Sequence, residues 1–173
     1  MSKIKVSVDG PVRLVTLARG EKRNALDAEM LDELKRAFAA PPAASERVTV
    51  IRAEGPVFCA GLDLRERDGG RVGSGAIEAM LHAIEVYPLP VVAVVQGDAI
   101  AGGNELAFHC DIVVALAPGL ISVIGGNVDD AVTMKHVPVT PDGKLATPDG
   151  TVLDTRYPWM VVLRVLYPAA PGS

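Results

Sequence analysis

In the middle of the chain, strand-like and helix-like segments alternate, and this alternation restricts the fold more than any other feature. Two valine-rich runs, Val48 to Ala53 and Val91 to Gln96, predict buried strands. Ile77 to Val86 has helical spacing and is followed by a proline, and Gly103 to Cys110 is expected to form a helix before a strand at Ile112 to Leu116. Because strands connected through helices pair in parallel, the pattern predicts an α/β fold.

The amino-terminal segment predicts a hairpin followed by an amphipathic helix. β-branched residues dominate Ile4 to Val8 and Val12 to Ala18, and Asp9-Gly10-Pro11 between them has the composition of a tight turn. From Asp27, a residue type that caps helices, apolar side chains recur at helical spacing until Pro41. The two strands are therefore expected to pair with each other before the helix begins.

The sequence after Ala117 has a different pattern. Strand-like segments at Leu120 to Ile124, Val132 to Val139 and Met160 to Leu166 are separated by glycine-containing turns, and no helical pattern lies between them. We therefore expect residues 117–173 to form a β-rich tail, with a join near Ala115 to Leu120.

Charge and segment lengths exclude several classes of partner. The formal net charge is −4, which gives no general attraction to nucleic acid or to anionic membranes. No apolar run approaches the roughly 20 residues of a membrane span, and the start lacks an apolar core of signal-peptide length, so a cytoplasmic location is expected. Cys59 and Cys110 are predicted to be buried, reduced thiols, and the three histidines lack convergent partners, so no metal site is expected.

Two short glycine-containing segments that follow strands contain the candidate chemistry. They are "VFCAGLDL", Val57 to Leu64, and "AIAGGNEL", Ala99 to Leu106. Small residues let a ligand approach backbone N–H groups that can stabilise an oxyanion, and Glu105 would sit beside that ligand, in a partly apolar environment, to move its proton. The alternative is structural: Gly102 and Gly103 allow close helix packing, and Glu105 favours the positive end of the helix dipole.

Three pieces of the sequence resemble the enoyl-CoA hydratase/isomerase, or crotonase, family: "EKRNALDAEML", "FCAGLDL" and "PLPVVAVVQGDAIAGGNELAFHCDIVVA". They follow the family's order over about residues 6–116. The resemblance implies an acyl-CoA thioester as substrate, with coenzyme A as part of that substrate and no separate cofactor. It implies that the N–H groups of Ala60 and Gly102 polarise the thioester carbonyl and that Glu105 is an acid and base. The residues matching the family's CoA-contacting segments are Asn24, Ala25, Leu26, Gly61, Leu62, Asp63 and Leu64.

The sequence departs from this family after residue 116. In the family, a Pro-Glu pair supplies a second glutamate there, and later helices complete the acyl pocket and build a trimer. At the corresponding distance this chain reads "VIGGN", Val123 to Asn127, without a carboxylate. We therefore expect an incomplete crotonase-like domain over residues 1–116 with impaired hydratase/isomerase function. A homo-oligomer stays open, and a trimer is not expected.

The tail resembles a second family. "ISVIGGNVDDAVTMKHVPVT" and "YPWMVVLRVLYP" are similar to the closing strands of a DUF2272-type domain, which is related to cysteine peptidases of the cell-wall amidase kind. The resulting fold class is a truncated crotonase-like α/β region of ββα repeats followed by a β-rich tail over 117–173. Two alternative functions remain: a remnant of a cell-wall peptidase-type protein, or a non-catalytic fusion product.

Overall fold

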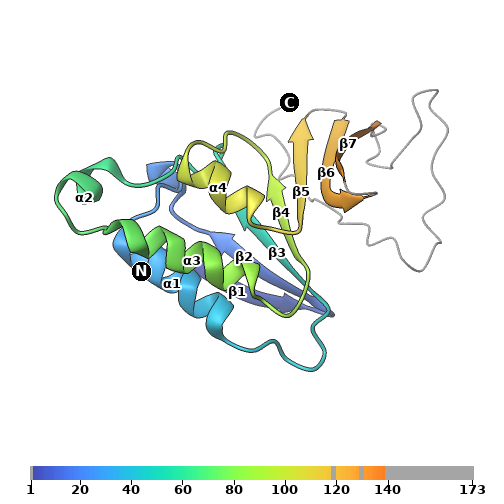
Figure 1. Ribbon diagram of the computed structural model, residues 1–173, viewed down its shortest axis with the longest axis horizontal. Coiled ribbons are helices and arrows are strands. Elements are labelled where there is room, and N and C mark those ends of the chain that lie inside the picture. Colours follow the sequence, from blue (N-terminus) through green and yellow to red (C-terminus); the bar gives the residue numbers. More distant parts are fainter. Residues whose placement is uncertain (1, 118–119, 129–130, 139–173) are drawn as a thin grey trace, which may run out of the picture.

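A computed structural model describes residues 2–117, 120–128 and 131–138. Within these residues, seven strands form one mixed sheet whose spatial order, β1 to β7, is also the order along the chain. The β1–β2 pair is antiparallel, the pairs from β2 to β5 are parallel, and β6 and β7 continue the sheet antiparallel. Helices α1 and α3 lie side by side over one face of the sheet (Figure 1).

The amino-terminal hairpin and helix form as predicted. Strands β1 (Ile4–Asp9) and β2 (Val12–Leu17) pair along their whole length. A short 3₁₀ helix, η1 (Gly20–Lys22), then leads to α1 (Ala28–Ala39). The Asp27 side chain caps α1 by accepting a hydrogen bond of 2.9 Å from the backbone N–H three residues further on.

The alternating segments form the parallel part of the sheet. Strands β3 (Val48–Ala53), β4 (Val91–Val95) and β5 (Ile112–Ala117) are neighbours. Helix α3 (Ser74–Glu85) connects the first pair of these strands, and α4 (Gly102–Phe108) connects the second. The α/β fold predicted from the sequence is therefore confirmed.

Two helical features differ from the prediction. A five-residue helix, α2 (Leu64–Asp68), lies in a charged run for which no helix was predicted. It is too short to show an apolar period, and it is capped by Asp63, whose carboxylate accepts a hydrogen bond from Arg65 N at 3.1 Å. Helix α3 also begins at Ser74 rather than near Ile77, because the glycines before Ile77 conceal its start.

The main core lies between the sheet and helices α1 and α3. Its fully buried side chains include Leu17, Met30, Leu34, Ile51, Met80 and Ile84. A smaller cluster on the opposite face contains Val50, Val92 and Val94. Successive residues of a strand point to opposite faces, so Val50 and Ile51 are buried on the two sides of the sheet, as is typical of parallel strands.

The strands after residue 117 continue the same sheet. Strand β6 (Leu120–Val128) pairs with β5, and β7 (Ala131–Pro138) pairs with β6. Two of the predicted tail strands are thus confirmed, but β6 continues to Val128 with an irregularity after Gly125, where a turn between strands was expected. The β5–β6 pairing crosses the expected join. The third, Met160 to Leu166, lies outside the described residues. In the part of the chain that the structure covers, no helix combines the length and apolar content needed to cross a bilayer.

Candidate active site

The two glycine-containing segments lie side by side at the carboxyl ends of β3 and β4. The N–H of Cys59 donates to the Asp98 carbonyl over 3.2 Å, and the N–H of Ile100 donates to the Cys59 carbonyl over 2.9 Å. These bonds form a parallel bridge between Cys59 and Ala99. Since carboxyl ends of adjacent parallel strands meet at one edge, the sheet topology brings together segments far apart in sequence, at a place where α/β proteins commonly bind ligands.

Three glycines allow this close approach, each in a different way. Gly61 has a φ of +85°, and a Cβ added there would lie 2.8 Å from the Ile100 carbonyl oxygen. A Cβ at Gly103 would lie 2.2 Å from the Cys59 carbonyl oxygen, so the close-packing role considered for the glycine pair is confirmed at Gly103. A Cβ at Gly102 would lie 2.9 Å from Ile77 Cδ1 and 3.7 Å from the nearest backbone atoms.

The backbone N–H groups available to a ligand differ from those expected. The Ala60 N–H donates to the Arg23 carbonyl over 3.0 Å, so it already has a partner inside the protein. The N–H groups of Leu62 and Gly102 donate to none of the residues that the structure describes. A Cβ added at Gly102 would lie 3.7 Å from Leu62 N, so these two donors are neighbours.

Gly102 follows a residue with a strained backbone. Ala101 has φ 47° and ψ −119°, a combination that residues other than glycine rarely adopt. Such a conformation costs about 1–3 kcal/mol and persists only where the surrounding structure imposes it. The ψ angle of Ala101 sets the orientation of the peptide that carries the Gly102 N–H.

Glu105 lies in the first turn of α4 with its side chain exposed to solvent. Its carboxylate forms no hydrogen bond or ion pair with any other residue in the described ranges. The apolar residues Ile100 and Phe108, near it in sequence, are also exposed, by 46% and 58%. In the described part of the structure the Glu105 carboxylate is therefore open to water, and its expected role in proton transfer stays a prediction.

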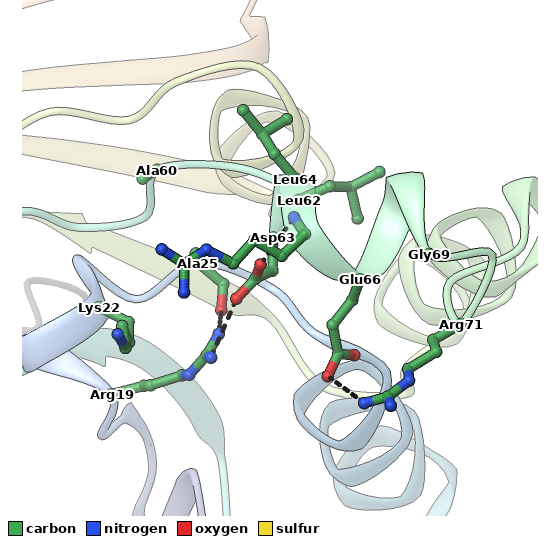
Figure 2. Close-up of a pocket in the computed structure, with 11 residues that line it drawn as sticks. Arg19, Lys22, Ala25, Ala60, Leu62, Asp63, Leu64, Glu66, Gly69 and Arg71 are labelled. Carbon is green, nitrogen blue, oxygen red and sulfur yellow. Dashed lines mark hydrogen bonds and ion pairs between the residues drawn. The ribbon is translucent and has the colours of Figure 1, made fainter.

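A cavity of about 810 Å³ opens beside Leu62 (Figure 2). It is lined by Arg19, Lys22, Ala25, Ala60, Leu62, Asp63, Leu64, Arg65, Glu66, Gly69 and Arg71. Four of these side chains are cationic and two are anionic, which gives the lining a positive balance. The volume is in the range of small-molecule sites. Gly102 and Glu105 do not line it.

Three of the residues matched to CoA-contacting segments are also absent from the lining. Asn24 is fully buried; its amide nitrogen donates to two backbone carbonyls over 2.8 and 2.9 Å, and its oxygen accepts from Arg19 N. Leu26 is in the core, and its N–H donates to the Gly61 carbonyl over 2.8 Å. Asn24, Leu26 and Gly61 thus hold the cavity wall in place, while Ala25 and Leu62 line it.

Both cysteines are buried free thiols, as predicted. Burial raises the pKa of Cys59 to about 11 and the pKa of Cys110 to about 12. Because the thiolate is the nucleophilic form, neither thiol is suited to attack a substrate at neutral pH. This observation argues against a cysteine peptidase site in the described ranges.

Comparison with known proteins gives the family. The model of the family described as enoyl-CoA hydratase/isomerase matches residues 8–122, which contain both glycine segments and Glu105. The chain belongs to the enoyl-CoA hydratase/isomerase family. The resemblance noted in the sequence is therefore confirmed, and the adjacent N–H groups lie in the part of the chain that carries the family pattern.

Curated relatives extend well beyond the part that they share with this chain. The human enoyl-CoA hydratase domain-containing protein 3, mitochondrial, is 33% identical over 174 residues, which cover 96% of this chain and 52% of the human protein. An enoyl-CoA isomerase/hydratase of Mycosarcoma maydis is 36% identical over 128 residues, covering 64% and 45%. The chain thus spans about half the length of these relatives. The human protein is named as mitochondrial, so the cytoplasmic location expected for this chain stays a prediction.

Solved structures confirm the crotonase-like fold. An enoyl-CoA hydratase from Bacillus anthracis superimposes with a TM-score of 0.60 at 31% identity, covering 65% of this chain and 47% of that one. A Thermobifida fusca protein in complex with acetoacetyl-CoA gives a TM-score of 0.57 at 29% identity, covering 66% and 51%.

A second family model matches the later part of the chain. It describes an uncharacterised protein conserved in bacteria (DUF2272) and matches residues 94–165, which confirms the resemblance of the tail. This match overlaps the enoyl-CoA hydratase/isomerase match over residues 94–122. The domain boundary at residue 116 therefore stays a prediction.

Proposed function

We propose that this chain binds an acyl-CoA thioester and polarises its carbonyl oxygen with the N–H groups of Leu62 and Gly102. The observation that carries the proposal is the adjacency of these two donors, neither of which has a partner among the described residues. Leu62 takes the place first given to Ala60, because the Ala60 N–H is bonded to Arg23. Fixed donors beside a thioester oxygen stabilise the enolate that forms when an α-proton leaves.

The cavity beside Leu62 would hold the CoA moiety. Ala25, Leu62 and Leu64 supply apolar surface, and Lys22 and Arg65 supply cationic groups that form no ion pair with any residue in the described part of the chain. Phosphate groups of CoA would receive charge-assisted hydrogen bonds from such side chains. The solved complex of the Thermobifida fusca protein with acetoacetyl-CoA supports this class of ligand.

Glu105 would carry the proton. Its carboxylate would take the α-proton, the C–H electron pair would move into the enolate held by the two N–H groups, and return of a proton would restore a thioester. Hydration also needs a group that activates water, and Val123 to Asn127, within β6, contain no carboxylate. We therefore propose α-proton exchange or double-bond migration rather than efficient hydration.

Ligand binding tests the donor pair. In titration calorimetry, butyryl-CoA should bind more tightly than free CoA, because only the thioester presents a carbonyl to Leu62 and Gly102. Equal affinity for the two ligands would contradict a functional donor pair, even if the cavity does bind the CoA moiety.

Isotope exchange tests Glu105 separately. Deuterium incorporation at the α-carbon of butyryl-CoA should be measurable by mass spectrometry and should disappear in Glu105→Gln. The matched control is Glu78→Gln, which changes an exposed carboxylate on a different helix, α3, and should retain deuterium exchange. Undiminished exchange in Glu105→Gln would remove Glu105 from this role, and hydratase turnover near that of a full-length homologue would contradict the proposed limit on hydration.

A further inference from the structure

Arg19 lies between two carboxylates that each cap a helix. Its Nη2 atom is 3.2 Å from Asp27 Oδ2 and 3.0 Å from Asp63 Oδ2, and its Nη1 donates to the Ala25 carbonyl over 2.7 Å. Asp27 caps α1 and Asp63 caps α2. Arg19 and Asp63 are 13% and 16% exposed, so water competes little for this contact. Figure 2 shows the Arg19 side chain reaching across the cavity wall to Asp63.

Asp63 directly follows the proposed donor Leu62. The backbone around this donor docks onto Leu26 through two hydrogen bonds of 2.8 Å, one from Leu26 N to the Gly61 carbonyl and one from Asp63 N to the Leu26 carbonyl. The Arg19–Asp63 ion pair fastens the same segment through side chains. Segment 61–63 is therefore tied to segment 25–27 by two backbone bonds and one shared guanidinium.

We infer that Arg19 is a positioning residue that holds segment 61–63 so that the Leu62 N–H stays beside the Gly102 N–H. The planar guanidinium presents several N–H donors in fixed directions and can bond to Asp27, Asp63 and the Ala25 carbonyl at once, which a lysine ammonium on a flexible stem cannot reproduce. This inference rests on the proposed function for its catalytic meaning, because it concerns the donor that polarises the thioester.

The contacts of Asp27 make this effect separable from folding. When Arg19 is removed, Asp27 keeps Lys3 as a partner at 2.5 Å and still caps α1. Asp63 loses the ion pair with Arg19 and keeps the cap bond from Arg65 N. The Ala25 carbonyl loses its donor as well, so the change is concentrated on segments 25–27 and 61–63.

Amide hydrogen exchange in the ligand-free protein tests the position directly. In Arg19→Met, exchange at the Leu26 and Asp63 amides should become about tenfold faster, while exchange at Ile51 in the core strand stays the same. Arg36→Met is the matched control, because it removes an exposed arginine that pairs with Asp32 within α1. Arg19→Lys should give an intermediate rate. If Arg19→Met does not fold, Asp63→Asn removes the charged partner of Arg19 and weakens the same contact from the other side.

Binding of butyryl-CoA then tests the consequence. The preference for butyryl-CoA over free CoA should fall about tenfold in Arg19→Met and remain in Arg36→Met. Equal acceleration of exchange at Leu26, Asp63 and Ile51 would overturn the inference, because it reports only lower global stability. A retained thioester preference despite faster local exchange would overturn it as well. If the unmodified chain shows no thioester preference, the proposed function fails, and exchange at Leu26 and Asp63 alone decides whether Arg19 holds the segment.

Discussion

The N–H of Ile100 donates to the carbonyl oxygen of Cys59 over 2.9 Å, which joins the segment after β4 to the segment after β3. This bond runs beside the contact of Gly103 with Cys59. The adjacency of Leu62 and Gly102 depends on this short crossing of two backbones. Substitutions at this crossing should therefore lower the free energy of unfolding as well as disturb the two donors.

Gly103→Ala should destabilise the fold strongly. The added Cβ would meet the Cys59 carbonyl oxygen at 2.2 Å, and because that atom belongs to the backbone, the two segments would have to separate. We expect a loss of about 2–3 kcal/mol in urea denaturation. Gly75→Ala in α3 is the control: its Cβ meets nothing within 4 Å, so better helix propensity should stabilise the protein by about 0.5–1 kcal/mol.

Asn24→Ala should lower the free energy of unfolding by about 2–4 kcal/mol, because the Glu54 and Val57 carbonyls and the Arg19 N–H would lose their partner. Asn104→Ala, at an exposed position of α4, should have little effect in the same denaturation experiment. Unchanged stability of Asn24→Ala together with weaker binding of CoA would instead restore the ligand-contact role that the sequence suggested.

The Asp63 carboxyl should make stability sensitive to acid. Burial opposes its ionisation, but hydrogen bonds from Arg19 and from backbone N–H groups outweigh burial and lower the pKa of Asp63 from its ordinary value of 3.8. A lowered pKa in the folded state gives stability that is present above pH 3.8 and is lost as the pH falls through the folded-state pKa. Asp63→Asn should therefore be less stable at neutral pH and should lose less on acidification, as measured by thermal melts across pH 2–6. Parallel curves for the two proteins would argue against this coupling.

Both thiols should resist labelling while the protein is folded. With pKa values of about 11 for Cys59 and about 12 for Cys110, thiolate is scarce at pH 8, and burial blocks access to the reagent. A disulfide exchange reagent should titrate both thiols quickly in 6 M urea and slowly without it. Rapid modification of Cys59 under native conditions would show that the crossing of the two glycine segments opens readily.

The fold was largely predictable because its signals are local. Valine-rich runs identified β3 and β4, and Asp27 marked the start of α1. Helix α2 was not predictable in this way, since five residues contain no full apolar period and its contacts include the Asp63 cap and a hydrogen bond to Glu66 from the distant Ala28 N–H.

The sequence predicted which segments form the site, but not which of their backbone N–H groups are left without a protein partner. Strand order brings the two glycine segments together, yet Gly61, with a φ of +85°, turns the chain between Ala60 and Leu62. The Ala60 N–H therefore meets Arg23 while the Leu62 N–H remains free of described partners. Which of the two N–H groups is left without a protein partner depends on the φ angle of Gly61. Glycine adopts positive and negative φ about equally well, so the sequence does not specify this angle.

The order of the strands has a consequence for synthesis of the chain. From β1 to β7, each strand pairs with the strand made just before it, so none of these seven has to enter between two others, and this part of the sheet can grow while the chain leaves the ribosome. At each of these stages β1 is one edge of the sheet and the newest strand is the other. When synthesis has passed Val95 but not Ile112, the newest edge is an all-apolar strand, Val91–Val95, with open hydrogen-bonding groups, so nascent chains at this stage would be prone to pair with one another.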